Sequence, residues 1–361
     1  MSRLSQPMSA PFFYHPRMLT YDFGPGHPLK PERLRRTIEL LKAEAPEVEI
    51  IDPGLAEEAD ILRVHSAEFV DHVKALSIDP RLIEGVDNMG FSRHDTPPFA
   101  GMWESCLAYC GGAKRAAEAV RDGANLAFNI SGGLHHAKRS RANGFCVLSD
   151  PALAVVILRE KFERVAYVDI DLHHGDGPQS IFYKDPSVLT LSIHQDGRTL
   201  YPGSGFIDEE GADLTSINIP LPPKTEGAAW LHVFKETLDH AFRRFQPQAV
   251  VLQMGCDPHK LDPLGHLEVS VQHWVGAVAH VKAQGLPIVA VGGGGYHLPN
   301  VPRMWVAATL TLMRREFGPH IPEEITRDWG MSSYFDADSG GERGMEAALA
   351  ITAHWKDRLV S

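Results

Sequence analysis

One segment constrains the fold of this chain more than any other, because an apolar, β-branched run leads directly into acids and histidines. The run spans 165–168. The polar cluster that follows it consists of Asp169, Asp171, His173, His174 and Asp176. A short apolar run predicts a buried strand, and open α/β sheets carry their chemistry at the carboxyl ends of such strands. The segment therefore predicts a buried strand with a functional site directly after it.

The same pattern recurs along the chain. Further strands are predicted at 124–130, 188–194, 249–253 and 287–291, and helical patterns lie between such runs, among them 32–44, 102–121 and 228–242. Repeated alternation of strand and helix predicts an α/β fold with a mainly parallel central sheet flanked by helices. We expect a single domain over 1–361, with a core at about 12–310 and a helical tail over 311–361.

Composition narrows the function classes. The formal net charge of -11 disfavours a nucleic-acid surface, because binding to phosphates needs a concentrated basic face. No apolar stretch approaches the roughly 18 residues of a membrane-spanning helix, and no secretory signal is visible in residues 1–11. The four cysteines form no CxxC pair, so a reducing cytoplasm is the expected location.

Three side chains from two predicted strand ends form a candidate metal site. Asp171 and His173 follow the first strand, and Asp257 follows the run at 249–253. On an extended chain, Asp169, Asp171 and His173 would lie on one side. Carboxylates and imidazole suit zinc or another borderline divalent ion, and three protein ligands leave a position open, as catalytic sites do. The alternative is a loop of capping aspartates and solvated histidines.

Two further strand ends supply candidate acid-base groups. The histidine pair His135 and His136 follows the run at 124–130, and Tyr296 follows four glycines at 292–295. An adjacent histidine pair beside two glycines favours catalysis over a satisfied core position. Four successive glycines are tolerated where the backbone turns sharply or approaches a ligand closely.

These groups together predict metal-assisted hydrolysis of an amide or a related acyl group. A metal polarises a carbonyl and activates water, an imidazole carries the proton to a leaving amine, and a phenol stabilises the oxyanion. Asp169 and Asp176 are available to orient the two histidines.

Composition alone favours Arg33 as a solvated first-turn residue, His65 as structural, and Asp95 as a turn former before Thr-Pro.

The motifs also carry a resemblance. Over about residues 12–310, the chain resembles the zinc-dependent histone deacetylase family. The motifs appear in the family's order: GHPLKPER, SGGLHHA, NGFC, VDIDLHHGDG, LSIH, YPGSG and GGGGY. The stretch QMGCDPHKLDPLGHL is most similar to the bacterial acetoin-utilisation branch, which resembles class I deacetylases, although Cys256 replaces the more usual Ala. The resemblance implies an arginase/deacetylase-like fold of about eight strands, with the active site at their carboxyl ends.

The resemblance assigns roles to the candidate residues. It implies zinc ligation by Asp171, His173 and Asp257. It further implies that His136 is the main general base and acid, oriented by Asp176. By the same resemblance, His135, oriented by Asp169, acts mainly through its charge, and Tyr296 donates to the oxyanion.

A narrow tunnel for an acyl-lysine stem is implied as well. The residues implied to bind substrate are Asp95, Gly144, Phe145, Tyr201 and Leu264. Phe145 and Tyr201 would flank the tunnel, Leu264 would lie near its rim, and Asp95 would accept backbone N–H groups of the substrate. Arg33 would line an inner channel for acetate release.

Monovalent cations, usually potassium, are a further implication of the resemblance. One site would combine the side chains of Asp169 and Ser192 with carbonyls of Asp171, His173 and Ile193. A second would use carbonyls around Phe182, Asp185 and Val188, where Thr215 stands in place of a common aromatic residue.

The function implied by the resemblance is zinc-dependent hydrolysis of N6-acetyl-lysine in proteins or peptides, and the acetoin-utilisation likeness suggests acyl-CoA synthetases as partners. Three alternatives stay open: an acetylpolyamine amidohydrolase, a ureohydrolase of the arginase type with two manganese ions, and a catalytically silent module that binds acyl-lysine. A ureohydrolase needs a second pair of aspartates, whereas Asp257 is followed by Pro258 and His259. The substrate protein, the preferred acyl chain and the oligomeric state cannot be read from the sequence.

Overall fold

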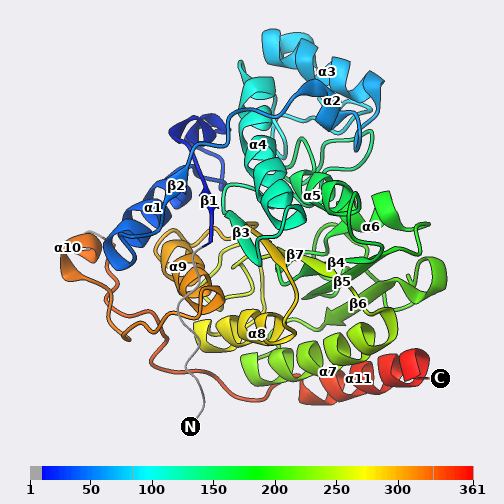
Figure 1. The fold of residues 1–361 in the computed structure, drawn as a ribbon, viewed down its shortest axis with the longest axis vertical. Coiled ribbons are helices and arrows are strands. Elements are labelled where there is room, and N and C mark those ends of the chain that lie inside the picture. Colours follow the sequence, from blue (N-terminus) through cyan, green and yellow to red (C-terminus); the bar gives the residue numbers. More distant parts are fainter. Residues whose placement is uncertain (1–9, 84, 328, 361) are drawn as a thin grey trace.

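The computed structural model describes residues 10–83, 85–327 and 329–360 (Figure 1). Residues 1–9, most of the segment in which no secretory signal is expected, lie outside the described residues. In the part of the chain that is described, eight strands form one sheet in the order β2-β1-β3-β8-β7-β4-β5-β6. Every pairing between neighbouring strands is parallel, which confirms the predicted α/β fold.

The strands are β1 Phe12–Phe13, β2 Ile50–Ile51, β3 Leu126–Asn129, β4 Val165–Asp169, β5 Val188–Gln195, β6 Ser216–Leu221, β7 Ala249–Gln253 and β8 Ile288–Val291. The helices are α1 Glu32–Glu44, α2 Glu58–Ile61, α3 Ala67–Ile78, α4 Met102–Arg121, α5 Asp150–Leu158, α6 Asp176–Phe182, α7 Gly227–Phe245, α8 Val271–Ala283, α9 Asn300–Leu312, α10 Glu323–Thr326 and α11 Met345–Val360.

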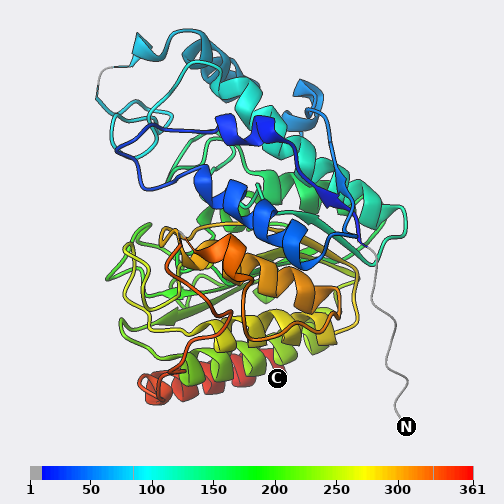
Figure 2. The ribbon, with the colours of Figure 1, turned by 90° about the vertical axis from the view of Figure 1, so that its left-hand side faces the viewer.

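Alternate residues of each strand face opposite sides of the sheet. In β4, Ala166 and Val168 pack into one hydrophobic cluster, whereas Val165 and Tyr167 pack into a second. The first cluster joins the sheet to a row of helices that neighbour one another in the order α11, α7, α8, α9 and α1. The second joins it to α3, α4 and α5 on the other side (Figures 1 and 2). Both faces of the sheet are therefore covered, which explains why its strands read as continuous apolar runs.

Strand order explains why loops far apart in the sequence meet. β3, β8, β7 and β4 are neighbours at the centre of the sheet. Their last residues are in register, since Asn129 pairs with Val291, Val291 with Gln253, and Gln253 with Asp169. The loops that follow leave the same edge of the sheet side by side, and these are the loops that carry the polar and glycine-rich clusters of the sequence.

Most long elements match the sequence predictions. The helices predicted at 32–44 and 102–121 are confirmed as α1 and α4, and the tail predicted as helical contains α11. The sequence analysis did not predict β2, β6 or α6. β6 carries Pro220 and lies at the edge of the sheet, where a proline is tolerated, so its pattern does not read as a central strand.

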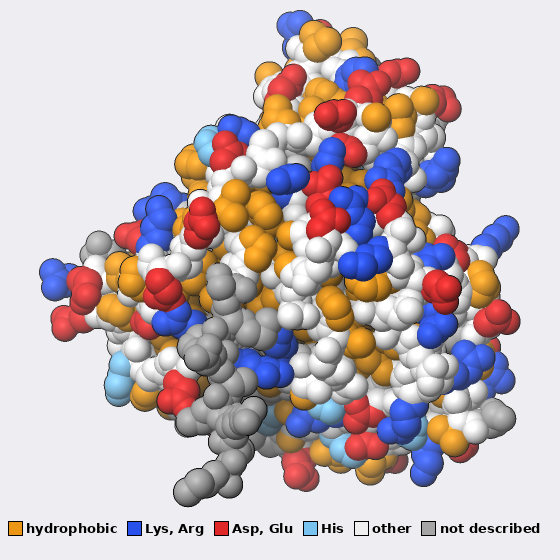
Figure 3. Space-filling model, in the orientation of Figure 1, with side chains coloured by type: hydrophobic (Ala, Val, Ile, Leu, Met, Phe, Trp, Pro, Cys, Tyr) orange, Lys and Arg blue, Asp and Glu red, His pale blue; other side chains and the backbone are white. Residues whose placement is uncertain are grey.

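The surface fits the charge of the chain. On the face shown in Figure 3, acidic and basic side chains are interspersed and no continuous basic area is visible. Among the described residues, we find no helix with the length and apolar character that crossing a bilayer would take. The organisation of 1–361 as a single domain stays a prediction.

Candidate active site

The loops after β4 and β7 bring the three predicted metal ligands together in the interior. His173 Nδ1 lies 3.1 Å from Asp257 Oδ2 and 3.4 Å from Asp171 Oδ1. Ligand atoms of the three residues all lie within 4.8 Å of one another, and all three side chains are buried. In the described part of the chain, no other group of acids, histidines or cysteines has this spacing.

Backbone N–H groups fix both carboxylates of this cluster. Gly294 donates to Asp171 Oδ2 at 2.7 Å, and His173 donates to Asp171 Oδ1 at 3.0 Å. Leu172 donates to Asp257 Oδ1 at 3.0 Å. Each carboxylate is thus held before any ligand binds, which is the preorganisation that a metal site requires.

The electrostatics of the cluster favour a cation at its centre. Burial and the charge of Asp171 raise the pKa of Asp257 to about 7. Burial alone would lower the pKa of His173, but hydrogen bonds with Asp171 and Asp257 outweigh it and raise that pKa to about 10. The site therefore attracts positive charge, and its oxygen and nitrogen donors suit a borderline divalent ion. The donor set fits the predicted metal.

The expectation that Asp169, Asp171 and His173 share one side of an extended strand is wrong, because Asp171 and His173 lie after the end of the strand. β4 ends at Asp169, whose Oδ1 accepts a hydrogen bond from the backbone N–H of Asp171 at 3.0 Å. This side-chain turn redirects the chain. Asp169 Oδ2 instead accepts from Tyr167 at 2.6 Å and lies 2.8 Å from His135 Nδ1.

Each histidine of the predicted pair has its own carboxylate. His135 Nδ1 faces Asp169, and His136 Nδ1 lies 2.7 Å from Asp176 Oδ1. Burial would lower the pKa of His135, but the charges of Asp171 and Asp169 raise it to about 9. Burial and the charge of His135 lower the pKa of His136 to about 4. At neutral pH the pair therefore holds one charged and one neutral ring.

Asp150 holds the turn that carries this pair, and the sequence analysis did not identify it. Its carboxylate accepts hydrogen bonds from the backbone N–H groups of Gly133 and Leu134 at 2.9 to 3.0 Å. A Cβ at Gly132 would collide with the same carboxylate. The signal was present, because an acid at the start of a predicted apolar helix is a common capping arrangement, but its partner lay in another loop.

All five predicted substrate residues line one cavity of about 240 Å³. Its lining consists of Asp95, His136, Gly144, Phe145, His173, Leu200, Tyr201, Leu264 and Tyr296. The ring of Tyr201 lies 5.1 Å from that of His136, and the ring of Phe145 lies 5.8 Å from that of Tyr296. The walls are thus largely apolar or aromatic. The imidazoles of His136 and His173 and the phenol of Tyr296 supply polar groups to the lining.

Asp95 is both a turn residue and part of the cavity. Its Oδ2 accepts hydrogen bonds from Gly144 N at 2.9 Å and from the Thr96 hydroxyl at 2.9 Å. A Cβ at Gly144 would lie 2.5 Å from His136 Cδ2. Asp95 therefore fixes the backbone of Gly144, a position in the cavity wall where any side chain would collide with His136.

Among the four glycines at 292–295, Gly294 packs directly against the two carboxylates of the Asp171–His173–Asp257 cluster. A Cβ at Gly294 would collide with the carboxylate of Asp257, and Gly293 has a φ of +144°.

The expectation that Arg33 is solvated is wrong. Its side chain is buried, and Nη1 donates to the carbonyls of Gly293 and Gly295 at 3.0 and 2.9 Å. Arg33 also borders a small cavity of about 20 Å³ behind the glycines, where the resemblance places an inner channel.

Asp262 is a second residue that the sequence analysis missed. Its Oδ2 accepts from the backbone N–H of Tyr296 at 2.6 Å and of His297 at 3.2 Å, and its Oδ1 accepts from Leu264 N at 3.0 Å. One buried carboxylate thus holds the backbone at two residues that line the cavity, Leu264 and Tyr296. Its signal was a second Asp, five residues after Asp257, inside the same motif.

The residues implied for monovalent cations lie beside β4 and β5. Asp169 and Ser192 are register partners in these strands, and Ser192 Oγ lies 2.9 Å from His194 Nδ1. Phe182, Asp185 and Val188 form successive backbone turns between α6 and β5. Cation binding at either place stays a prediction.

The fold and the site together define a class of α/β proteins. At the carboxyl edge of their parallel sheet, these proteins carry a cluster of two aspartates and a histidine that could hold a metal, and two adjacent histidines that each pair with a carboxylate. The family model described as histone deacetylase domain matches residues 27–312. The chain belongs to the histone deacetylase family.

Relatives of known name agree with this membership. The chain is 38% identical over 331 residues to the acetoin utilization protein AcuC of Bacillus subtilis (strain 168), covering 88% of this chain and 86% of the relative. It is 35% identical over 318 residues to histone deacetylase clr6 of Schizosaccharomyces pombe, covering 86% and 78%. It is 36% identical over 308 residues to histone deacetylase 6 of Arabidopsis thaliana, covering 82% and 65%. The family supports deacetylase activity, hence a hydrolase that acts on amides.

We predict that Gly294→Ala reduces metal binding, because the added methyl group displaces the carboxylate of Asp257. Metal per chain, measured by mass spectrometry after reconstitution with zinc, should fall several-fold from a value near one. Gly318→Ala is the matched control, since a Cβ there meets no atom within 4 Å. Full occupancy in Gly294→Ala would show that Asp257 is not a ligand.

Proposed function

We propose that this protein is a zinc-dependent lysine deacetylase that hydrolyses the amide of N6-acetyl-lysine to lysine and acetate. The observation that carries the proposal is the convergence of three groups at one cavity: the buried Asp–His–Asp cluster, the neutral imidazole of His136 and the phenol of Tyr296. Asp171, His173 and Asp257 would hold the ion, and a divalent ion bound there supplies Lewis acidity that polarises a carbonyl and makes water more acidic.

His136 is proposed as the general base and acid. Asp176 occupies its Nδ1, so we propose Nε2 as the nitrogen that accepts the proton of the attacking water, in exchange for its 3.1 Å contact with His135 Nε2, and then returns the proton to the leaving lysine amine. A pKa of about 4 keeps the ring ready to accept a proton at neutral pH. Asp176 is held in turn by Lys138 at 2.8 Å and Asn143 at 3.3 Å, so the ring orientation is fixed before substrate binds.

Tyr296 and His135 are proposed to stabilise charge. Burial raises the pKa of Tyr296 well above its usual value, so the phenol stays protonated and can donate to an oxyanion. His135 carries a positive charge beside Asp169 and lies 3.1 Å from His136, where it stabilises negative charge that develops in the reaction.

The cavity walls support an acyl-lysine stem as substrate. Phe145, Leu200 and Tyr201 offer apolar and aromatic contacts to a chain of methylenes, and Leu264 lies at the same cavity. We propose proteins or peptides as substrates, with Asp95 near the entrance to receive backbone N–H groups. Potassium at the two predicted sites and acyl-CoA synthetases as substrates are proposed on the family resemblance alone, and a cytoplasmic location is proposed on the absence of a CxxC pair among the four cysteines.

Turnover of a substrate panel tests this function. Protein loaded with one equivalent of zinc should hydrolyse acetyl-lysine peptides, lose activity with a chelator and regain it with zinc. Acetyl-, propionyl- and butyryl-lysine peptides and acetylated polyamines complete the panel. A higher kcat/KM for acetylated polyamines would overturn the assignment of lysine as substrate, and binding without turnover of any compound would favour a silent acyl-lysine module.

We predict that His136→Ala lowers kcat by roughly 10²- to 10⁴-fold, because the proton carrier is lost. Zinc content should stay near one per chain, since His136 is not among the three ligands. His232→Ala, on α7, serves as the control and should keep full activity. Loss of zinc from His136→Ala would mean that a ligand has been misassigned.

For Tyr296→Phe, we expect kcat to fall by roughly 10²- to 10³-fold with little change in KM, because the variant keeps the ring and loses the oxyanion donor. Steady-state kinetics on an acetyl-lysine peptide measure both values. The exposed Tyr183 provides the matched Tyr→Phe control, since it is absent from the lining of the catalytic cavity. Unchanged turnover in Tyr296→Phe would exclude the phenol as the oxyanion donor.

A further inference from the structure

Helix α11 lies outside the segment matched by the family model, which ends at residue 312. It packs beside α7 and next to β6, the edge strand of the sheet (Figure 1). The indole N–H of Trp355 donates to the backbone carbonyl of Asn218 in β6 at 2.9 Å. Arg358 forms an ion pair with Glu210. An edge strand presents carbonyls without a strand partner, and α11 satisfies one of them.

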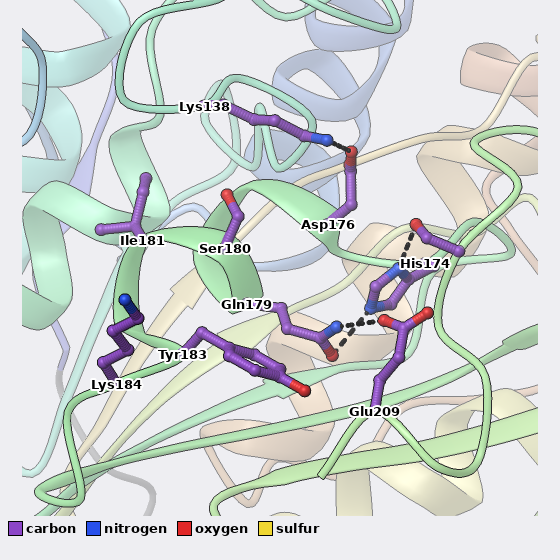
Figure 4. Close-up of a pocket in the computed structure, with 10 residues that line it drawn as sticks. Lys138, His174, Asp176, Gln179, Ser180, Ile181, Tyr183, Lys184 and Glu209 are labelled. Atoms are coloured by element: carbon purple, nitrogen blue, oxygen red, sulfur yellow. Dashed lines mark hydrogen bonds and ion pairs between the residues drawn. The ribbon is translucent and has the colours of Figure 1, made fainter. Parts of the chain in front are cut away.

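Asn218 connects this anchored strand to residues deeper in the structure through its side chain. Its side-chain Nδ2 donates to Gln179 Oε1 at 2.9 Å and to the backbone carbonyl of Glu209 at 3.1 Å. Gln179 Nε2 donates to Glu209 Oε2 at 2.6 Å, and Glu209 Oε1 accepts the backbone N–H groups of Gly205 and Phe206 at 3.0 and 3.2 Å. Figure 4 shows Gln179 and Glu209 facing each other, and both residues line a cavity of about 530 Å³.

The direction of these hydrogen bonds follows from Glu209. A carboxylate only accepts, so the amide nitrogen of Gln179 must face it and the amide oxygen must face His174 and Asn218. His174 Nε2 therefore donates to Gln179 Oε1 at 3.0 Å, and His174 Nδ1 accepts from the Ser204 hydroxyl at 2.9 Å. His174 directly follows the metal ligand His173. The network thus joins α11, β6 and α6 to the loop over residues 200–210, here called the 200–210 loop.

The 200–210 loop carries one wall of the catalytic cavity. Leu200 and Tyr201 line that cavity, and the ring of Tyr201 lies 5.1 Å from His136 and 6.4 Å from His173. Tyr201 itself is 40% exposed, so packing alone does not fix its ring. The loop is held on its inner side by the hydrogen bonds to Ser204, Gly205 and Phe206 described above.

We propose that α11 is a positioning element for the substrate wall, in which Trp355 and Arg358 hold the 200–210 loop against the catalytic cavity through β6 and the Asn218–Gln179–Glu209 network. None of these residues touches the reacting atoms, so they act on substrate binding through Tyr201. The inference rests on the proposed function only where it is tested by turnover of an acetyl-lysine peptide.

The test compares three variants of α11 in the full chain. Trp355→Phe keeps a buried ring and removes the N–H donor, Arg358→Ala removes the ion pair, and Lys356→Ala is the control, an exposed cation of the same helix. We expect amide hydrogen exchange in the 200–210 loop to become about tenfold faster in Trp355→Phe and about twofold faster in Arg358→Ala, because an exposed ion pair contributes little. Exchange in β4 and β7, and zinc per chain, should match the parent protein.

Kinetics separate positioning from a general loss of structure. For an acetyl-lysine peptide, we expect KM in Trp355→Phe to rise about fivefold, with kcat changed less than twofold, because the wall moves and the acid-base groups do not. Unchanged exchange in the loop with unchanged KM would overturn the inference and leave α11 as a cover of the sheet edge.

Two further outcomes are decided by the same set of variants. If Trp355→Phe fails to fold, as shown by faster exchange in every strand, then Arg358→Ala against Lys356→Ala decides: faster loop exchange in Arg358→Ala alone supports the inference, and equal exchange overturns it. If the parent hydrolyses no acyl-lysine peptide, the proposed function fails, but the exchange of the 200–210 loop still tests the role of α11.

Discussion

The mutual repulsion of two buried carboxylates, Asp171 and Asp257, is the constraint on which the rest of the site depends. Placing both in a dry interior costs several kcal/mol for each charge unless positive charge lies between them. His173 provides it as a proton in the free chain, and a divalent ion fits the same place. The backbone donors of Gly294 and Leu172 and the close packing of the glycines make sense as the means to hold these charges together.

The parallel sheet delivers these groups from distant parts of the chain. In the central strands β3, β8, β7 and β4, the carboxyl ends are in register, so each loop contributes one component. These are, in the same order, the histidine couple, the glycine run, Asp257, and Asp171 with His173. Three further carboxylates lie outside the Asp–His–Asp cluster. Asp150, Asp176 and Asp262 each hold a backbone segment or an imidazole ring in place, so the geometry of the candidate site also depends on acids outside that cluster.

The sequence predicts much of this arrangement, because the parallel strands are buried on both faces and their apolar runs end at chemical groups. It predicted the α/β class, the long helices and the side chains that line the cavity apart from Leu200. It failed where the deciding contact is not local. Arg33 looks solvated on α1, but carbonyls some 260 residues away bury it. Asp169 and Asp171 were placed on one strand face because alternation does not reveal that a side-chain turn ends β4. β6 was missed because its Pro220 is acceptable only at an edge, and edge position follows from topology rather than sequence.

Asp262 has a consequence for how selectivity can change. The same carboxylate accepts hydrogen bonds from the backbone at Leu264 and at Tyr296, and both residues line the cavity. Under the proposed function, a change at Leu264 that moves this carboxylate would also move the backbone of Tyr296, so substrate choice and reaction rate would be linked through Asp262.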